Sequence, residues 1–270
     1  MLLERHSIPG LDGDPDVTVI TVRPRDTAPA SPALVSAHGG GFVMGSAEGD
    51  LSPPAQIATE TRAVVVSVDY RLAPEHPYPA AVHDYDAALV WTAENSTALG
   101  IDRHRIAVGG VSAGAALAAA VALMARDREE SALCLQALDI PVLDDRLTTA
   151  SMRQVTDTPV WNRPNAEASR RHYLRALPDG APTPPYAAPA RAEDLTGLPP
   201  AYVSVCEFDP LRDEGIEYTQ RLVASGVSTE LHLFPGTFHG SAGAAPDASV
   251  SRRMRAEFVD ALRRAYTRPS

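Results

Sequence analysis

The sequence predicts an α/β fold in which a mostly parallel central sheet is flanked by helices. Short β-branched runs alternate along the chain with segments of helical apolar spacing, and this order is typical of parallel βαβ units. The 270 residues are 44% hydrophobic, which is enough to bury one substantial core without division into two domains. We therefore expect residues 1–270 to form a single domain.

The first half of the chain follows this alternation closely. The run DVTVITVRP alternates apolar and polar residues as an edge strand does, and PALVSAHGGG begins as a buried strand that breaks into three glycines. AVVVSVDY is a β-branched run that fits a buried parallel strand. The strands are expected at 16–24, 32–37, 63–70 and 105–110, and the helices at 51–62, 79–96 and 113–128.

After the strand-like run at 133–143, strand-like and helix-like segments no longer alternate. Residues 141–200 hold 10 of the 24 prolines, about twice an even share, with short helical pieces such as NAEASRRHYLRAL between them. We therefore expect an inserted cap or lid at 144–196 within the single domain. Regular structure is expected to return with strands at 200–208 and 228–236 and helices at 214–226 and 249–266.

Composition excludes several kinds of chemistry. All 24 basic residues are arginine, so Schiff-base catalysis, a P-loop lysine and an S-x-x-K dyad are absent from this chain. A formal net charge of -10 argues against nucleic acid or an anionic membrane as partner and leaves a small-molecule substrate.

Cellular location is predicted from the cysteines and the apolar runs. Cys134 and Cys206 lie in apolar segments, where buried free thiols in strands are expected, and this favours a reducing compartment. The first residues carry charges and lack the apolar stretch of a signal peptide, and no run of about 18 apolar residues is present. We expect a soluble cytoplasmic protein.

The strongest chemical motif is Gly110-Val111-Ser112-Ala113-Gly114. It is a G-x-S-x-G sequence between a predicted strand and a predicted helix, the context in which a tight turn presents a nucleophilic serine. Glycines two residues to either side let strand and helix approach closely, and the helix N-terminus directs its free N–H groups toward charge that develops at the serine. The alternative is a structural glycine loop without catalytic function.

A second glycine motif, His38-Gly39-Gly40-Gly41, follows a predicted strand upstream of the serine. Three glycines expose backbone N–H groups, as in the HGGG type of oxyanion loop, which acts together with the N–H that follows the nucleophile, here Ala113. No G-x-G-x-x-G opens a helix, and the eight histidines show no H-E-x-x-H spacing. We expect no cofactor and no catalytic metal.

An acid and a histidine should follow the serine in that order. Asp209 lies at the end of a predicted strand in SVCEFDPLRDEG, and His239 ends the next one in LHLFPGTFHG. Both fall at the carboxyl ends of strands, where open α/β sheets place their sites. Three other carboxylates compete with Asp209 for this position, namely Glu207, Asp213 and Glu214.

The segments HGGGF, DYRLAPEHPYPAAVHD, GVSAG, FDPLRDEG and FHG occur in this order. With them the chain resembles the hormone-sensitive lipase-like α/β-hydrolases, the bacterial family IV esterases, from about residue 15 onward. The resemblance implies an α/β-hydrolase fold and a serine carboxylesterase that forms an acyl-enzyme on short-chain esters.

Each site residue has a role by this resemblance. Ser112 is the nucleophile, His239 the general base and then acid, and Asp209 the carboxylate that orients the imidazole. Gly40, Gly41 and Ala113 are the expected oxyanion donors. The charged and histidine side chains of the DYRLAPEHPYPAAVHD segment are expected to be structural, bracing the oxyanion loop; they are Asp69, Arg71, Glu75, His76 and His83.

Three departures from the family pattern set this chain apart. Val111 stands where the family has Asp or Thr, and Ser241 where it has Phe, while little chain precedes His38 for an N-terminal part of the cap. A more open acyl pocket is expected.

Two other functions and one assembly state remain open at this stage. The first function is action on one dedicated substrate as a lactonase, deacetylase, acyltransferase or dehydratase, and the second is a non-catalytic ligand-binding module. A homodimer is common in this fold family.

Overall fold

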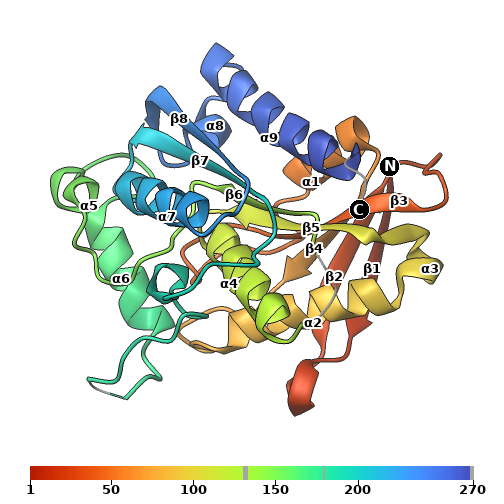
Figure 1. Cartoon of the computed structure of the whole chain (residues 1–270), viewed down its shortest axis with the longest axis horizontal. Coiled ribbons are helices and arrows are strands. Elements are labelled where there is room, and N and C mark those ends of the chain that lie inside the picture. Colours follow the sequence, from red (N-terminus) through yellow and green to blue (C-terminus); the bar gives the residue numbers. More distant parts are fainter. Residues whose placement is uncertain (130–132, 179, 268–270) are drawn as a thin grey trace.

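The computed structural model describes residues 1–129, 133–178 and 180–267, and one twisted sheet runs through its centre with helices on both faces (Figure 1). The strand order is β1-β2-β4-β3-β5-β6-β7-β8. The pairs β1–β2 and β2–β4 are antiparallel and all the other neighbours are parallel. The mostly parallel α/β-hydrolase sheet predicted from the sequence is therefore confirmed.

The bounds of the elements follow the sequence pattern within a few residues. The strands are β1 (Leu2–Ile8), β2 (Val17–Arg23), β3 (Ser31–Ala37), β4 (Val64–Asp69), β5 (Ile101–Val111), β6 (Leu135–Asp139), β7 (Ala201–Phe208) and β8 (Thr229–Phe238). The α-helices are α1 (Ser52–Thr61), α2 (Ala80–Glu94), α3 (Ser96–Leu99), α4 (Ala113–Asp127), α5 (Ala150–Gln154), α6 (Arg163–Tyr173), α7 (Arg212–Ala224), α8 (Ser241–Ala244) and α9 (Ser249–Thr267). Short 3-10 turns occur at Leu11–Gly13 and Pro189–Arg191.

The core lies on both faces of the sheet. In β4, Val64, Val66 and Val68 belong to the apolar cluster on the face that α2 covers, while Val65 belongs to the cluster on the face that α1 covers. This two-sided burial explains why the strand is a continuous β-branched run rather than an alternating one. The alanines of α4 are all buried, and their small side chains let this helix contact β3, β5 and β6 closely.

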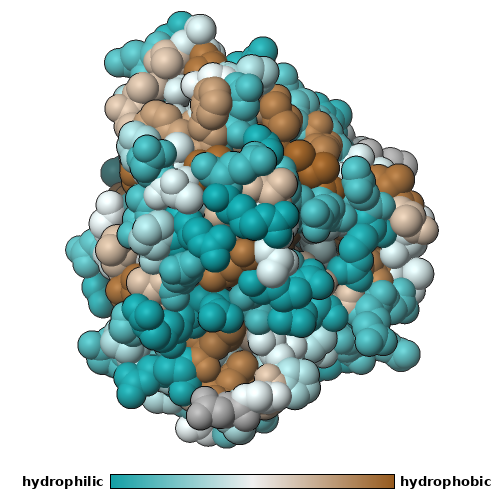
Figure 2. Space-filling model, turned by 90° about the vertical axis from the view of Figure 1, so that its left-hand side faces the viewer, coloured by the Kyte–Doolittle hydropathy of each residue, from teal (hydrophilic) through white to brown (hydrophobic). Residues whose placement is uncertain are grey.

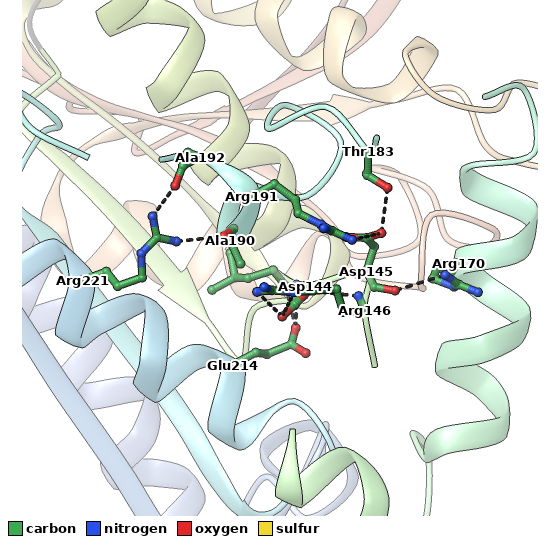
Figure 3. Close-up of polar contacts among 11 residues, drawn as sticks. Asp144, Asp145, Arg146, Arg170, Thr183, Ala190, Arg191, Ala192, Glu214 and Arg221 are labelled. Atoms are coloured by element: carbon green, nitrogen blue, oxygen red, sulfur yellow. Dashed lines mark hydrogen bonds and ion pairs between the residues drawn. The ribbon is translucent and has the colours of Figure 1, made fainter. Parts of the chain in front are cut away.

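Residues 144–196 lie between β6 and β7 and contain α5 and α6. One set of contacts joins the two ends of this segment, and another ties its C-terminal part to α7 (Figure 3). Asp145 accepts hydrogen bonds from Arg191 at 2.6 Å and from Thr183 at 2.7 Å, and Arg221 of α7 donates to the carbonyls of Ala190 and Ala192. Figure 2 shows the side of the molecule that carries α5 and α6; its middle is mainly hydrophilic, and hydrophobic side chains gather above and below.

Two features differ from the sequence-based expectation. Strand β1 was not expected, because its residues are mostly exposed and polar; as an edge strand it pairs with β2 and has little to bury. The expectation of two buried cysteines in strands is correct for Cys206 in β7 and wrong for Cys134, which is only partly buried and precedes β6; both thiols are free. In the described ranges no helix is long and apolar enough to cross a membrane.

Candidate active site

Ser112 occupies the sharp turn between β5 and α4. Its backbone angles are φ 57° and ψ -116°, a region that residues with a side chain rarely adopt. A Cβ atom on Gly110 would lie 2.6 Å from the carbonyl oxygen of Ala37, and one on Gly114 would clash with that same oxygen. The two glycines therefore permit the close crossing of β3, β5 and α4 that forces this turn.

Three side chains from separate strand ends meet at this turn. His239 Nε2 lies 2.9 Å from Ser112 Oγ, and His239 Nδ1 lies 2.7 Å from Asp209 Oδ2. All three residues are at least 95% buried. In this geometry Nδ1–H donates to the carboxylate, which leaves the Nε2 lone pair to accept the hydroxyl proton of the serine.

Asp209 is fixed by the chain around it. It directly follows β7, and its second oxygen, Oδ1, accepts a hydrogen bond of 2.9 Å from the backbone N–H of Leu211 at the start of α7. The carboxylate therefore has one oxygen held by the backbone and the other turned to His239. A carboxylate held in this way keeps the imidazole in one orientation and one tautomer.

The competing acids have other partners. Glu207 accepts a hydrogen bond from the N–H of Gly236 at 2.7 Å, and Asp213 pairs with Arg212 and accepts the N–H of Ser151. Glu214 is buried beneath residues 143–144 and accepts their N–H groups at 2.6 and 3.2 Å. Burial raises the pKa of Glu214 well above its ordinary value.

The glycine loop after β3 lies against the same turn. Gly40 and Gly41 have φ values of 117° and 60°, and a Cβ on Gly41 would lie 2.6 Å from the ring of Trp161. Gly39 is close enough that its Cβ would contact Ser112 Cβ at 3.5 Å. Ala113 is the first residue of α4, where backbone N–H groups have no partner within the helix. The three expected oxyanion donors thus belong to two segments that meet at Ser112.

His38 anchors the base of the glycine loop. Its Nδ1–H donates to the carbonyl of Gly39 at 2.7 Å, and its ring stacks on Tyr70 with centroids 4.2 Å apart. The hydroxyl of Tyr70 donates in turn to the carbonyl of His38 at 3.0 Å. Burial lowers the pKa of His38, so the ring stays neutral near pH 7 and serves as a support.

The charged and histidine side chains of the DYRLAPEHPYPAAVHD segment differ in their burial and in their partners. Asp69 accepts the N–H of Ala47 at 2.8 Å and so supports the chain that follows the glycine loop, while Arg71 pairs with buried Asp84 at 2.7 Å. Glu75 is exposed, so its expected part in this support is wrong. The two histidines, His76 and His83, lie at partly or fully exposed positions, and His83 pairs with Asp14.

Sequence reasoning did not find the contribution of residues 144–196 to the site. The ring of Trp161 lies with its centroid 5.8 Å from that of His239. Ser169 of α6 donates a hydrogen bond of 2.6 Å to the carbonyl of Gly41, and the ring of Tyr173 stacks on Phe42 with centroids 3.9 Å apart. No local motif marks these residues, because only the fold brings them to the glycine loop.

A small pocket opens between the glycine loop and α6. Its apolar walls include Phe42, Leu143, Trp161, Tyr173 and Leu211. Two acidic side chains, Asp144 and Asp145, also line it, and both are bound to arginines, Arg146 and Arg191. Apolar walls are suited to a hydrocarbon group, and one of them, Trp161, also lies beside His239.

The departures from the family pattern have structural explanations. Val111 packs against an apolar cluster that contains Ile140, Cys206 and Phe234, so its environment suits a hydrocarbon side chain. Ser241 is buried at the start of α8, and the next residue, Ala242, packs against the same cluster.

One group of side chains has metal-ligand character. Glu230, His232 and Glu257 each offer a ligand atom, and these atoms lie within 4.8 Å of one another. His232 and Arg264 already pair with Glu230, at 2.6 and 2.5 Å. The group lies on β8 and α9, apart from Ser112.

Known proteins of similar sequence and structure have the same architecture. A profile of the alpha/beta hydrolase fold matches residues 34–243. Esterase LipI of Mycobacterium tuberculosis is 43% identical over 213 residues, which are 79% of this chain and 66% of LipI. Carboxylesterase NlhH of the same species is 39% identical over 258 residues, which are 95% of this chain and 81% of NlhH. A solved bacterial heroin esterase superposes with a TM-score of 0.95 at 50% identity and covers 99% of this chain and 85% of its own.

The fold, the site and these relatives define an α/β-hydrolase enzyme that acts on carboxylic esters. More closely, the chain belongs to the alpha/beta hydrolase fold family matched by the profile, in its hormone-sensitive lipase-like branch.

Proposed function

We propose that this protein hydrolyses short-chain acyl esters through an acyl-enzyme on Ser112. The observation that carries the proposal is the continuous contact from Asp209 through His239 to Ser112 Oγ at 2.7 and 2.9 Å, on the sharp backbone turn between β5 and α4. This is the arrangement of nucleophile, base and orienting acid that acyl transfer requires.

The chemistry follows from this geometry. Ser112 Oγ bonds to the ester carbonyl carbon while its proton passes to His239 Nε2, and the negative charge of the tetrahedral intermediate falls on the former carbonyl oxygen. The N–H groups of Gly40, Gly41 and Ala113 are the donors proposed for that oxygen. The imidazolium then protonates the leaving alcohol, and the carbon–oxygen bond breaks to leave an acylated serine.

Deacylation uses the same groups, with water as the nucleophile and Ser112 Oγ as the leaving group. His239 takes a proton from water, the hydroxide oxygen attacks the acyl carbon, and the proton returns to Ser112 Oγ as the acid leaves. Asp209 stabilises the imidazolium in both halves.

We propose that residues 144–196 act as a cap that sets the acyl length. Trp161 stands beside His239, and the stacked rings of Phe42 and Tyr173 close one wall of the pocket. A pocket closed by aromatic rings has room for few methylene groups, and each excess methylene is strongly disfavoured by overpacking.

A p-nitrophenyl ester series of increasing acyl length tests these assignments. We expect turnover on acetate and butyrate that declines with longer chains and falls by at least about 10³-fold in the folded Ser112→Ala variant. Turnover that survives this substitution contradicts the nucleophile assignment. Equal rates for acetate and laurate contradict the confined pocket.

We further propose that two copies associate through β8. This strand is an edge of the sheet within the described residues, and Leu231 and Leu233 on it are exposed beside exposed Val223 of α7. An edge strand with apolar neighbours favours self-pairing about a two-fold axis. Light scattering should give twice the mass of one chain, and Leu233→Lys should give the single-chain mass.

We also propose that the protein works in the cytoplasm. The free thiols of Cys134 and Cys206 fit a reducing compartment. Fractionation of the native host, with activity followed in each fraction, tests this location; activity confined to the cell envelope or medium contradicts it.

A further inference from the structure

Ser169 joins α6 to the glycine loop through its side chain. It lies in the interior of α6, is 5% exposed, and its hydroxyl donates the 2.6 Å hydrogen bond to the carbonyl of Gly41. A serine inside a helix can bond the carbonyl one turn before it, but a hydroxyl has a single proton, and here that proton is directed to another segment. The contact therefore depends on a hydroxyl at position 169, since alanine has no donor there.

The peptide before Gly41 is held by the backbone of its own turn. The carbonyl of Gly40 accepts the N–H groups of Val43 and Met44, both at 3.1 Å. In a trans peptide the carbonyl and the N–H point in opposite directions, and this peptide carries the N–H of Gly41, one of the proposed oxyanion donors. The turn at 40–44 therefore sets the direction of that N–H.

The peptide after Gly41 is held from α6. Its carbonyl accepts the Ser169 hydrogen bond, whereas the next carbonyl, that of Phe42, accepts the N–H of Ala73 at 2.8 Å. Gly41 and Phe42 have φ values of 60° and 64°. Glycine enters and leaves this conformation easily, so the local sequence does not fix the turn. Ser169 thus supplies a side-chain restraint at a residue that has no side chain of its own.

Helix α6 is attached to the rest of the protein without the Ser169 bond. Arg170 donates to the carbonyl of Asp145 at 3.2 Å (Figure 3). The carbonyl of Tyr173 accepts the N–H of Tyr78 at 2.8 Å. Loss of the Ser169 hydroxyl should therefore leave the helix in place and release only the glycine loop.

We propose that Ser169 is a positioning residue of the reaction, whose hydroxyl holds the turn of Gly41 so that the N–H of Gly41 stays directed at the oxygen that becomes negative in the tetrahedral intermediate. This inference rests on the proposed function. The hydrogen bond to that oxygen strengthens as its charge develops, so a displaced donor raises the barrier more than it weakens binding of the neutral ester. The effect is therefore expected in kcat rather than in KM.

The test compares Ser169→Ala, which removes the hydroxyl, with Ser169→Thr, which keeps one. Thr92→Val is the control, because it removes a buried hydroxyl of α2 that bonds the carbonyl of Ala88 in its own helix at 2.6 Å. With p-nitrophenyl acetate we expect Ser169→Ala to lower kcat by about tenfold and to change KM by less than about twofold. Ser169→Thr should recover most of kcat, and Thr92→Val should keep the wild-type rate.

Thermal unfolding of the same variants separates positioning from stability. Ser169→Ala and Thr92→Val each lose one buried hydrogen bond, so both should unfold at a lower temperature than wild type. Only Ser169→Ala should lose turnover well below that temperature. A wild-type kcat in folded Ser169→Ala overturns the proposal. An equal loss in Ser169→Thr also overturns it, because the hydroxyl is then not the group that matters.

An alkyl trifluoromethyl ketone measures the oxyanion site more directly. Ser112 Oγ bonds to the ketone carbon, the serine proton passes to His239, and the former carbonyl oxygen takes the negative charge. The inhibition constant should rise in Ser169→Ala by about the factor by which kcat falls, about tenfold. A wild-type inhibition constant contradicts the proposed role of Ser169.

A measurement independent of turnover separates this inference from the proposed function. In the Ser112→Ala background, NMR relaxation of the Gly41 amide should give a lower order parameter when Ser169→Ala is added. An unchanged order parameter overturns the role of Ser169 even if Ser112 is confirmed as nucleophile. Activity that persists in Ser112→Ala contradicts the proposed function instead.

Discussion

The indole ring of Trp161 lies beside the imidazole of His239, with centroids 5.8 Å apart and ring planes inclined by 36°. The two residues come from different parts of the fold, since Trp161 belongs to the segment between β6 and β7 and His239 follows β8. The family pattern has a phenylalanine two residues after the histidine, where this chain has Ser241. Trp161 thus supplies an aromatic wall near the histidine from a different segment.

Replacement of Trp161 by alanine should therefore widen the acyl range. Loss of the indole opens space beside His239 and Gly41, so we expect the ratio of kcat/KM for p-nitrophenyl butyrate to that for acetate to rise by about tenfold. Trp91→Ala is the matched control, because Trp91 lies on α2 against His6. An unchanged ratio in Trp161→Ala would show that another wall limits the acyl group.

Two amide substitutions test whether Asp209 or Glu207 is the carboxylate that orients His239. Asp209→Asn should lower kcat by about 10³ to 10⁴, because the amide no longer stabilises the imidazolium or enforces its tautomer. Glu207→Gln should stay within about threefold of wild type, since Glu207 binds the N–H of Gly236 instead of the imidazole. Steady-state kinetics of both variants measure this, and the reverse order of effects would assign the acid to Glu207.

Glu214 should make the protein less stable as pH rises. Burial raises its pKa in the folded state, so the folded protein binds more protons than the unfolded chain above the ordinary carboxyl pKa. Under this condition the free energy of unfolding falls with increasing pH. Glu214→Gln keeps an oxygen for the N–H groups of residues 143 and 144 and removes the charge, so it should be more stable than wild type at pH 8 by about 1 kcal/mol.

Urea unfolding at pH 4.5 and pH 8 checks this expectation. The difference between Glu214→Gln and wild type should be small at the lower pH and largest at the higher one. A variant that is destabilised, and more so at pH 8 than at pH 4.5, would mean that the carboxylate is needed in its charged form.

Chelation should leave hydrolysis unchanged. The proposed steps use Ser112, His239 and backbone N–H groups, and the group of possible metal ligands at Glu230, His232 and Glu257 lies apart from them. Activity before and after dialysis against EDTA measures this. If chelation lowers kcat and added zinc restores it, a metal takes part in the reaction.

Much of the fold could be predicted because its signals are local. The β-branched run of β4 is explained by burial on both faces, and the small residues around Ser112 by the close crossing of β3, β5 and α4. Asp209 and His239 could be placed near Ser112 because the carboxyl ends of parallel strands meet at one edge of the sheet.

Other features depend on contacts between distant segments. Strand β1 buries too little to show a pattern, and its pairing with β2 is a property of the assembled sheet. Trp161 and Ser169 lie in a proline-rich segment without regular spacing and reach Gly41 only through tertiary folding.

The backbone conformation of Ser112 has a practical consequence. Its φ of 57° is held by contacts among β3, β5 and α4, and an isolated strand–turn–helix peptide would not retain it. The reactivity of the hydroxyl therefore depends on the assembled protein, and unfolded chains should not react as an activated serine does. An organophosphorus reagent that labels activated serines should therefore label native molecules only. The fraction of chains labelled at each temperature of a thermal ramp would report the fraction that is folded.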